Sequence, residues 1–275
     1  MGKRHQPWLF YCRGCDLWRS SLDMLNEKTA PIYIYRELEG LRQLRVNNSN
    51  VILEALSRFG TLDGLELLDV GCSYGWFMEV ARKRGIIPHG LDYQKEKAEK
   101  AIANGLDIKT GYFPEDVESS KRYDIIAFND VLEHFKDVDR ALKSSRKFMR
   151  DGGKLIIAYP DSNGFYYRLA LLLFLLGWKA PFFRMWQKGY PSPHLYYFNS
   201  RNLEKLVSSY GFRLIEDREV PTYTLKGIWG RIHVDKKRPS LFSVLLYISV
   251  MAVSLTVQRL FKSDFRFHIY QKLPG

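Results

Sequence analysis

The feature that most constrains the fold of this chain is an alternation of short apolar runs with polar, helix-patterned stretches between residues 65 and 159. Runs rich in Ile, Val and Leu predict buried strands at 65–70, 86–91, 108–110, 123–128 and 154–159. Helices are predicted between them, at 76–84, 95–104 and 138–149, and a turn is predicted at Gly152-Gly153 before the last of these strands. Parallel strands joined in this way need crossover connections, and both faces of their sheet then need covering. The order therefore predicts an α/β fold, with a mostly parallel sheet and helices on both faces.

Two more strands are predicted near the end of the chain. Residues 212–220 follow a helix that Ser200 would cap and that Gly211 would end. Apolar and polar side chains alternate along 265–273, which is typical of a half-buried strand. We expect these two strands to pair with each other.

A glycine-containing turn follows the first of the predicted buried strands, between Asp69 and Gly75. Glycine lets the backbone bend and approach a ligand closely, and the free N–H groups at the start of the next helix favour an anionic group. The turn has the spacing D-x-G-x-x-x-G and therefore lacks the G-x-G-x-x-G pattern of dinucleotide-binding proteins. Asp92 ends the next strand, where a carboxylate can accept hydrogen bonds from both hydroxyls of a ribose. Together these features indicate a nucleotide-like ligand.

In this order the sequence blocks resemble the class I S-adenosylmethionine-dependent methyltransferases, and among them the ubiquinone-biosynthesis O-methyltransferases and related small-molecule enzymes. The matching blocks are the glycine turn, Asp92, the strand that opens at Tyr123, the stretch from Asp130 to His134, and Gly152-Gly153. The resemblance covers about 45–220 and the last strand, and it implies a Rossmann-like, seven-stranded sheet with an antiparallel last strand. It also implies methyl transfer from S-adenosylmethionine to a small-molecule, sugar or lipid-linked acceptor, above all to a hydroxyl group.

The same resemblance assigns residues to the cofactor. Those expected to bind it are Asp69, Gly71, Cys72, Ser73 and Gly75 in the turn, Asp92 on the ribose, Asn129 near the methionyl end, and Tyr112 with Phe113. Relatives often carry Gly-Asp after the third strand, whereas this chain has Gly111-Tyr112-Phe113. An aromatic ring could therefore stack on the adenine in place of the acid contact.

Three residues are candidates for catalysis, namely His134, Glu133 and His194. A neutral imidazole can take the proton of a hydroxyl acceptor, and His134 is the best placed because it lies just beyond the fourth strand. The alternative is that Glu133 and His134 only pack or cap, and that His194 belongs to lid packing. An acceptor that is already an anion or an amine needs no base.

The N-terminal region carries Cys12 and Cys15, a C-x-x-C pair that resembles the zinc-knuckle start of some related methyltransferases. Tetrahedral zinc needs four ligands, and His5 would supply only a third, so no metal is expected. Three cysteines and the lack of an apolar leader favour a reducing cytoplasm. We expect residues 1–45 to be an extension and 46–275 a methyltransferase domain with a lid-like insertion at 161–199 and an apolar insertion at 221–264.

Charge and one apolar segment point to an anionic partner. Lys and Arg outnumber Asp and Glu by 42 to 30, giving a net charge of +12. Residues 241–257 carry no charge and have basic flanks, but a single crossing is excluded if the strands on either side pair. We therefore predict peripheral contact with the inner face of a membrane, with a helix packed on the sheet as the alternative.

Two rival functions remain open. An RNA methyltransferase is disfavoured because the chain has no Asp/Asn-Pro-Pro-aromatic motif and no recognisable RNA-binding module. A non-catalytic protein of the same fold would bind a nucleotide without transferring a methyl group. The oligomeric state is not predicted.

Overall fold

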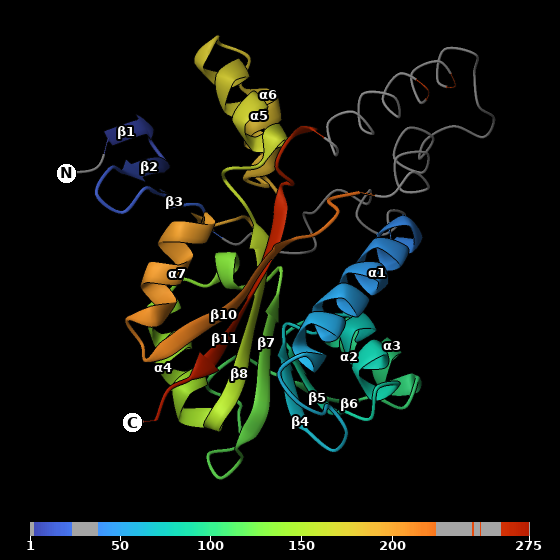
Figure 1. Ribbon diagram of the computed structural model, residues 1–275. Helices are drawn as coiled ribbons and strands as arrows, with labels where there is room; N and C mark the ends of the chain where they lie inside the picture. Colours follow the sequence, from blue (N-terminus) through green and yellow to red (C-terminus); the bar gives the residue numbers. More distant parts are fainter. Residues whose placement is uncertain (1–2, 24–37, 224–243, 245–247, 249–259, 275) are drawn as a thin grey trace.

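The computed structural model describes residues 3–23, 38–223, 244, 248 and 260–274. Seven of the described strands form one sheet in the order β10-β11-β8-β7-β4-β5-β6 (Figure 1). Their bounds are β4 (Glu66–Val70), β5 (Ile87–Asp92), β6 (Asp107–Thr110), β7 (Tyr123–Asn129), β8 (Met149–Pro160), β10 (Phe212–Glu219) and β11 (Phe265–Lys272). The five strands from β4 to β8 are parallel, and β11 is antiparallel to both β8 and β10. The predicted α/β class and the pairing of the last two strands are confirmed.

Helices cover both faces of this sheet because its central strands are apolar on both sides. One face packs against α1 (Leu38–Ser57) and α2 (Trp76–Arg82), and the other against α4 (Val138–Phe148) and α7 (Ser200–Ser208). Neighbouring strand residues belong to the cores on opposite faces. Leu67 lies in the core cluster with α1 and α2, and Leu68 lies in the cluster with α4 and α7. A further helix, α3 (Lys95–Ala103), lies beside α2 (Figure 1).

One local prediction is wrong at the start of β8. We expected a turn at Gly152-Gly153, but the strand already begins at Met149 and continues through both glycines. The pairing of β7 with β8 shifts register between Tyr123 and Ile125, so the extra residues form a bulge rather than a turn.

A second local correction concerns the start of α7. Asn199, and not Ser200, is the N-cap: its side chain accepts a hydrogen bond from the Asn202 N–H at 2.9 Å. The Asn202 side chain in turn accepts from the Asn199 N–H at 3.0 Å. Both residue types favour this position, and the reciprocal capping box decides for Asn199.

The N-terminal region forms strands that the sequence did not predict. They are β1 (Lys3–Gln6), β2 (Leu9–Cys12) and β3 (Leu17–Ser20), and β3 pairs with β9 (Tyr196–Tyr197), which lies far along the chain. This small sheet packs on α5 (Phe165–Leu175) and α6 (Ala180–Met185). We call these six elements the accessory layer. Its core consists of Trp8, Leu9, Trp18, Tyr167, Ala170, Phe174, Phe182, Trp186 and Tyr197.

Two predictions on chain organisation are not settled by these elements. The division at residue 45 and the two insertions stay predictions, although 161–199 does hold α5, α6 and β9. Apart from positions 244 and 248, the apolar segment 241–257 lies outside the described residues. Within the described part of the chain, no helix is both long and apolar enough to cross a bilayer.

Candidate functional site

The turn between β4 and α2 can be made only with glycine at two positions. Gly71 and Gly75 have φ angles of 70° and 72°. A Cβ on Gly71 would lie 2.6 Å from a methyl carbon of Val131, and one on Gly75 would lie 2.3 Å from a methyl carbon of Leu106. The turn therefore packs directly against its neighbours, and no side chain caps the start of α2.

Asp92 lies against this turn at the end of β5. Its two carboxylate oxygens accept hydrogen bonds from the N–H groups of Ser73 and Gln94, both at 2.7 Å. The side chain is buried. A carboxylate has about four lone-pair positions, so Asp92 can accept hydrogen bonds from more than these two groups. The predicted proximity of Asp92 to the glycine turn is thus present in the structure.

A buried polar pair, Asp69 and Asn129, lies at the ends of β4 and β7. The Asn129 Nδ2 donates to Asp69 Oδ1 at 3.2 Å. Burial raises the pKa of Asp69 to about 7. The Asn129 Oδ1 is buried and has no hydrogen-bond partner among the described residues. An unsatisfied acceptor of this kind favours a ligand that brings an N–H donor.

Cys72 lies between these groups but contributes packing rather than a reactive thiolate. Its side chain is buried in a cluster with residues of α2 and α3. Burial raises the pKa of its thiol, followed by the negative charges of Asp69 and Asp92. Cys72 therefore contributes to the site through its position in the turn and not through its thiol.

The two predicted aromatic contacts separate in the structure. The rings of Tyr112 and Tyr93 are stacked, with centroids 5.6 Å apart, and 61% of Tyr112 is exposed. Phe113 instead belongs to the main core, where its ring meets those of Phe128 and Phe148 edge to face. Tyr112 remains available for stacking on a ligand, whereas packing in the core accounts for Phe113.

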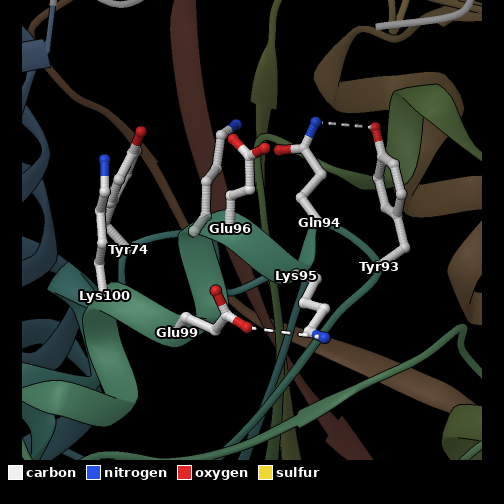
Figure 2. Close-up of a pocket in the computed structure, with 8 residues that line it drawn as sticks. Tyr74, Tyr93, Gln94, Lys95, Glu96, Glu99 and Lys100 are labelled. Atoms are coloured by element: carbon white, nitrogen blue, oxygen red, sulfur yellow. Dashed lines mark hydrogen bonds and ion pairs between the residues drawn. The ribbon is translucent and has the colours of Figure 1, made fainter.

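Tyr93 was missed by sequence reasoning, although an aromatic residue directly after Asp92, the acid expected on the ribose, was a usable signal. It lines a hollow of about 490 Å³ along the start of α3. Figure 2 shows Tyr74 and Tyr93 at opposite ends of the row of side chains around this hollow. Tyr93 and Gln94 follow Asp92 directly, so this hollow lies next to the end of β5. Its other lining residues are Gln94, Lys95, Glu96, Lys97, Glu99 and Lys100.

The structure brings the three catalytic candidates together. Glu133 and His134 belong to a short 3₁₀ turn, Leu132–His134, and His194 comes just before β9. Side-chain ligand atoms of all three lie within 4.8 Å of one another. Among the described residues, these three side chains form a group that could hold a metal ion. Cys12 and Cys15 belong to no such group of described residues.

The tautomer of His134 is determined by a main-chain group. Its Nδ1 lies 2.9 Å from the carbonyl oxygen of Pro193, which can only accept, so Nδ1 carries the proton. The lone pair is then on Nε2. Burial lowers the pKa of His134, which keeps the imidazole neutral. A neutral histidine with a free lone pair is the form that a general base needs.

His194 has a different environment. The side-chain amide of Gln187 lies 2.9 Å from its Nε2 and, with its nitrogen facing the ring, donates there. Burial, and after it neighbouring His134, lowers the pKa of His194 to about 3. Ser20, at the end of β3, donates its hydroxyl to the His194 carbonyl at 2.7 Å. The accessory layer thus positions a neutral His194 against the site.

Charge at the site is held by Asp130 and Arg45. Burial raises the pKa of Asp130, but the ion pair with Arg45 of α1, the two neighbouring histidines and a hydrogen bond from Glu133 together outweigh burial, so the pKa is lowered overall. Burial and then Asp130 raise the pKa of Glu133 well above its usual value. The two carboxyl groups therefore carry one negative charge between them, with Glu133 protonated. The contribution of Arg45 comes from a helix that no local pattern links to Asp130.

Comparison with known proteins gives a consistent result. A family model described as a methyltransferase domain matches residues 42–217. A ubiquinone biosynthesis O-methyltransferase of Coxiella burnetii (strain Dugway 5J108-111) is 27% identical over 172 residues, which are 60% of this chain and 71% of that protein. The enzyme of the same description from Coxiella burnetii strain RSA 493 is 32% identical over 109 residues, about half of its length.

Solved structures share the fold at low sequence identity. A SAM-dependent methyltransferase from Archaeoglobus fulgidus superposes with a TM-score of 0.58 at 16% identity, covering 88% of this chain and 100% of that one. Magnesium protoporphyrin IX methyltransferase from Synechocystis PCC 6803, with bound SAH, gives a TM-score of 0.55 at 13% identity and covers 85% of each chain.

Proposed function

This chain belongs to the methyltransferase-domain family and is an S-adenosylmethionine-dependent methyltransferase, and from that premise we propose that it methylates a hydroxyl group of a small molecule. The observation that carries the hydroxyl proposal is the tautomer of His134. Its Nδ1 is engaged by the Pro193 carbonyl, so that Nε2 can accept a proton. An acceptor that needs no deprotonation would have no use for this arrangement.

The residues at the strand ends fit S-adenosylmethionine. In this proposal the turn from Gly71 to Gly75 faces the methionyl part, and Asp92 accepts from the ribose hydroxyls. The buried, unsatisfied Asn129 Oδ1 would accept from the cofactor's ammonium group, which supplies the missing donor. Tyr112 would stack on the adenine.

The cofactor supplies a methyl group on a positively charged sulfur, which is a good leaving group. The chain's own residues must hold the acceptor oxygen in line and exclude water, and such alignment can contribute about 7–11 kcal/mol. As the oxygen–carbon bond forms and the sulfur–carbon bond breaks, the hydroxyl proton passes to Nε2 of His134. The products are a methyl ether, a neutral thioether and the imidazolium form of His134.

Glu133 and His194 serve as positioning residues in this account. The main-chain carbonyl of Glu133 accepts a hydrogen bond from Leu195, which attaches the His194 segment to the 3₁₀ turn. The negative charge on Asp130, next to Glu133 in this cluster, would stabilise the imidazolium of His134 once it forms. Protonated Glu133 adds no second charge.

The proposal that the acceptor is a small molecule is supported by the relatives, which are named for ubiquinone biosynthesis. We extend the proposal to a phenolic, sugar or lipid-linked hydroxyl, since the site itself does not select among them. Labelled S-adenosylmethionine should be incubated with the protein and each class of acceptor, and the products identified by mass spectrometry. A label on oxygen supports the proposal. A label found only on nitrogen, or no transfer to any class despite cofactor binding, would overturn it.

A further inference from the structure

Helix α5 exposes a contiguous apolar surface. Its buried side, with Tyr167, Ala170 and Phe174, packs into the accessory layer. The opposite side and the turn that follows leave large apolar side chains exposed: Leu169 by 39%, Leu172 by 53%, Leu175 by 65%, Leu176 by 74% and Trp178 by 61%. We call these five residues the apolar tip. Monomeric proteins rarely expose such a group unless it contacts something.

The apolar tip projects from the rest of the molecule. Figure 1 shows α5 and α6 extending beyond the end of the main sheet. A second apolar pair lies at the base of α5: the Phe261 ring is 4.6 Å from that of Phe165, and Phe261 and Leu260 are 51% and 71% exposed. Exposed apolar side chains therefore occur at both ends of this helix.

Charge along the segment that carries the apolar tip has a single sign. No Asp or Glu occurs between Ser162 and Leu203, in a chain that has 30 acidic residues. The exposed cations of the α5–α6 segment are Arg168, Lys179, Arg184 and Lys188. Apolar side chains with a tryptophan at the edge and a basic surround suit the interface of an anionic bilayer. A second copy of the chain is a poorer match, because two basic surfaces would face each other.

The position of the apolar tip relative to the site also favours a membrane. Strands β8, β7 and β4 are parallel, and α5 follows the end of β8. It therefore leaves the sheet at the edge where Asp69 and Asn129 lie. We propose that the apolar tip inserts into the surface of an anionic lipid bilayer and thereby turns the site toward the membrane. This inference goes beyond the proposed function and does not depend on it.

Vesicle flotation tests the proposal with the full chain. Wild-type protein should float with vesicles of phosphatidylcholine and phosphatidylglycerol, float less with phosphatidylcholine alone, and lose binding as salt is raised. The Leu172→Glu/Leu176→Glu double variant should stay in the soluble fraction. Ile102→Glu, which places the same type of charge on the exposed surface of α3, is the control and should float like wild type. Cofactor affinity and melting temperature should be unchanged in both variants.

Three outcomes would overturn the proposal. The first is that wild-type protein binds neither type of vesicle. The second is that the double variant floats as well as wild type, which would assign binding to another part of the chain. Light scattering could also show that wild type is a dimer that the double variant disrupts, which would make the apolar tip an interface between copies. As a direct readout, lipids with brominated tails should quench part of the fluorescence of wild type, and this part should be missing in Trp178→Phe.

Discussion

The main-chain N–H of Leu195 donates to the carbonyl oxygen of Glu133 at 2.8 Å. This bond joins two segments about sixty residues apart and brings the rings of His134 and His194 to a centroid distance of 4.8 Å. Both imidazoles are kept neutral by burial, and the Pro193 carbonyl determines the tautomer of His134. In the proposed reaction His134 is therefore the base and His194 a positioning residue.

Replacing Asp92 with alanine should weaken binding of S-adenosylmethionine. The change removes the acceptor for the N–H groups of Ser73 in the turn and of Gln94 after β5, as well as the proposed acceptor for the ribose. Hydrogen bonds to charged groups contribute about 1.5–3 kcal/mol each, so a loss of roughly 10- to 100-fold or more in affinity is expected. Calorimetry measures it, and wild-type affinity in Asp92→Ala would place the ribose elsewhere.

Gly71→Ala should destabilise the fold and impair cofactor binding. The left-handed backbone costs about 1–2 kcal/mol for alanine, and the new Cβ would also clash with Val131. Gly64→Ala is the matched control because its φ is 76° and no atom lies within 4 Å of its Cβ position. Denaturant unfolding should show a larger loss for Gly71→Ala, part of which Val131→Ala restores. Equal losses at the two glycines would contradict the packing argument.

The acid limb of kcat/KM should have its midpoint below pH 6.5. Burial lowers the pKa of His134, so the neutral base persists to lower pH than for an exposed histidine, and activity falls only as the pH drops through the lowered pKa. His134→Gln should lack this limb. A midpoint above 6.5, or the same limb in the variant, would assign it to another group.

His194 should make the protein less stable in acid. Its pKa is about 3 when folded and near 6.5 when unfolded, so the unfolded chain binds the extra proton and the free energy of unfolding falls as pH drops below about 6.5 toward 3. The pKa of Asp69 is raised to about 7 and acts in the opposite direction. The difference between wild type and His194→Gln isolates the histidine. Parallel stability curves for the two proteins would show that His194 is not buried as a neutral group.

Local sequence patterns were sufficient to predict the main sheet and the cofactor turn, because both depend on short-range rules. Periodic apolar runs define β4 to β8, and positive φ angles require Gly71 and Gly75. The same rules could not find the accessory layer, since β3 pairs with β9 across more than 170 residues. Neither could they choose between Tyr112 and Phe113, because that choice depends on which ring the core encloses.

The pairing of Arg45 with Asp130 shows a second limit of sequence reasoning. Arg45 of α1 is the first of the groups that lower the pKa of Asp130, and the charge of Asp130 adds to burial in raising the pKa of Glu133. Nothing near Asp130 in the sequence indicates this partner. Charge at the site is therefore a property of tertiary structure: the sequence singled out Glu133, His134 and His194, whereas the charged pair is Asp130 and Arg45.

The most direct test of the account is the ratio of kcat/KM for wild type to that for His134→Gln, measured with a hydroxyl acceptor across the pH range. A general base typically contributes about 10²–10⁴-fold, so the ratio should be of that order near pH 7. It should fall toward one at high pH, where the acceptor ionises without help, while cofactor affinity stays unchanged in the variant. A ratio near one at every pH would contradict the assignment of His134 as the base.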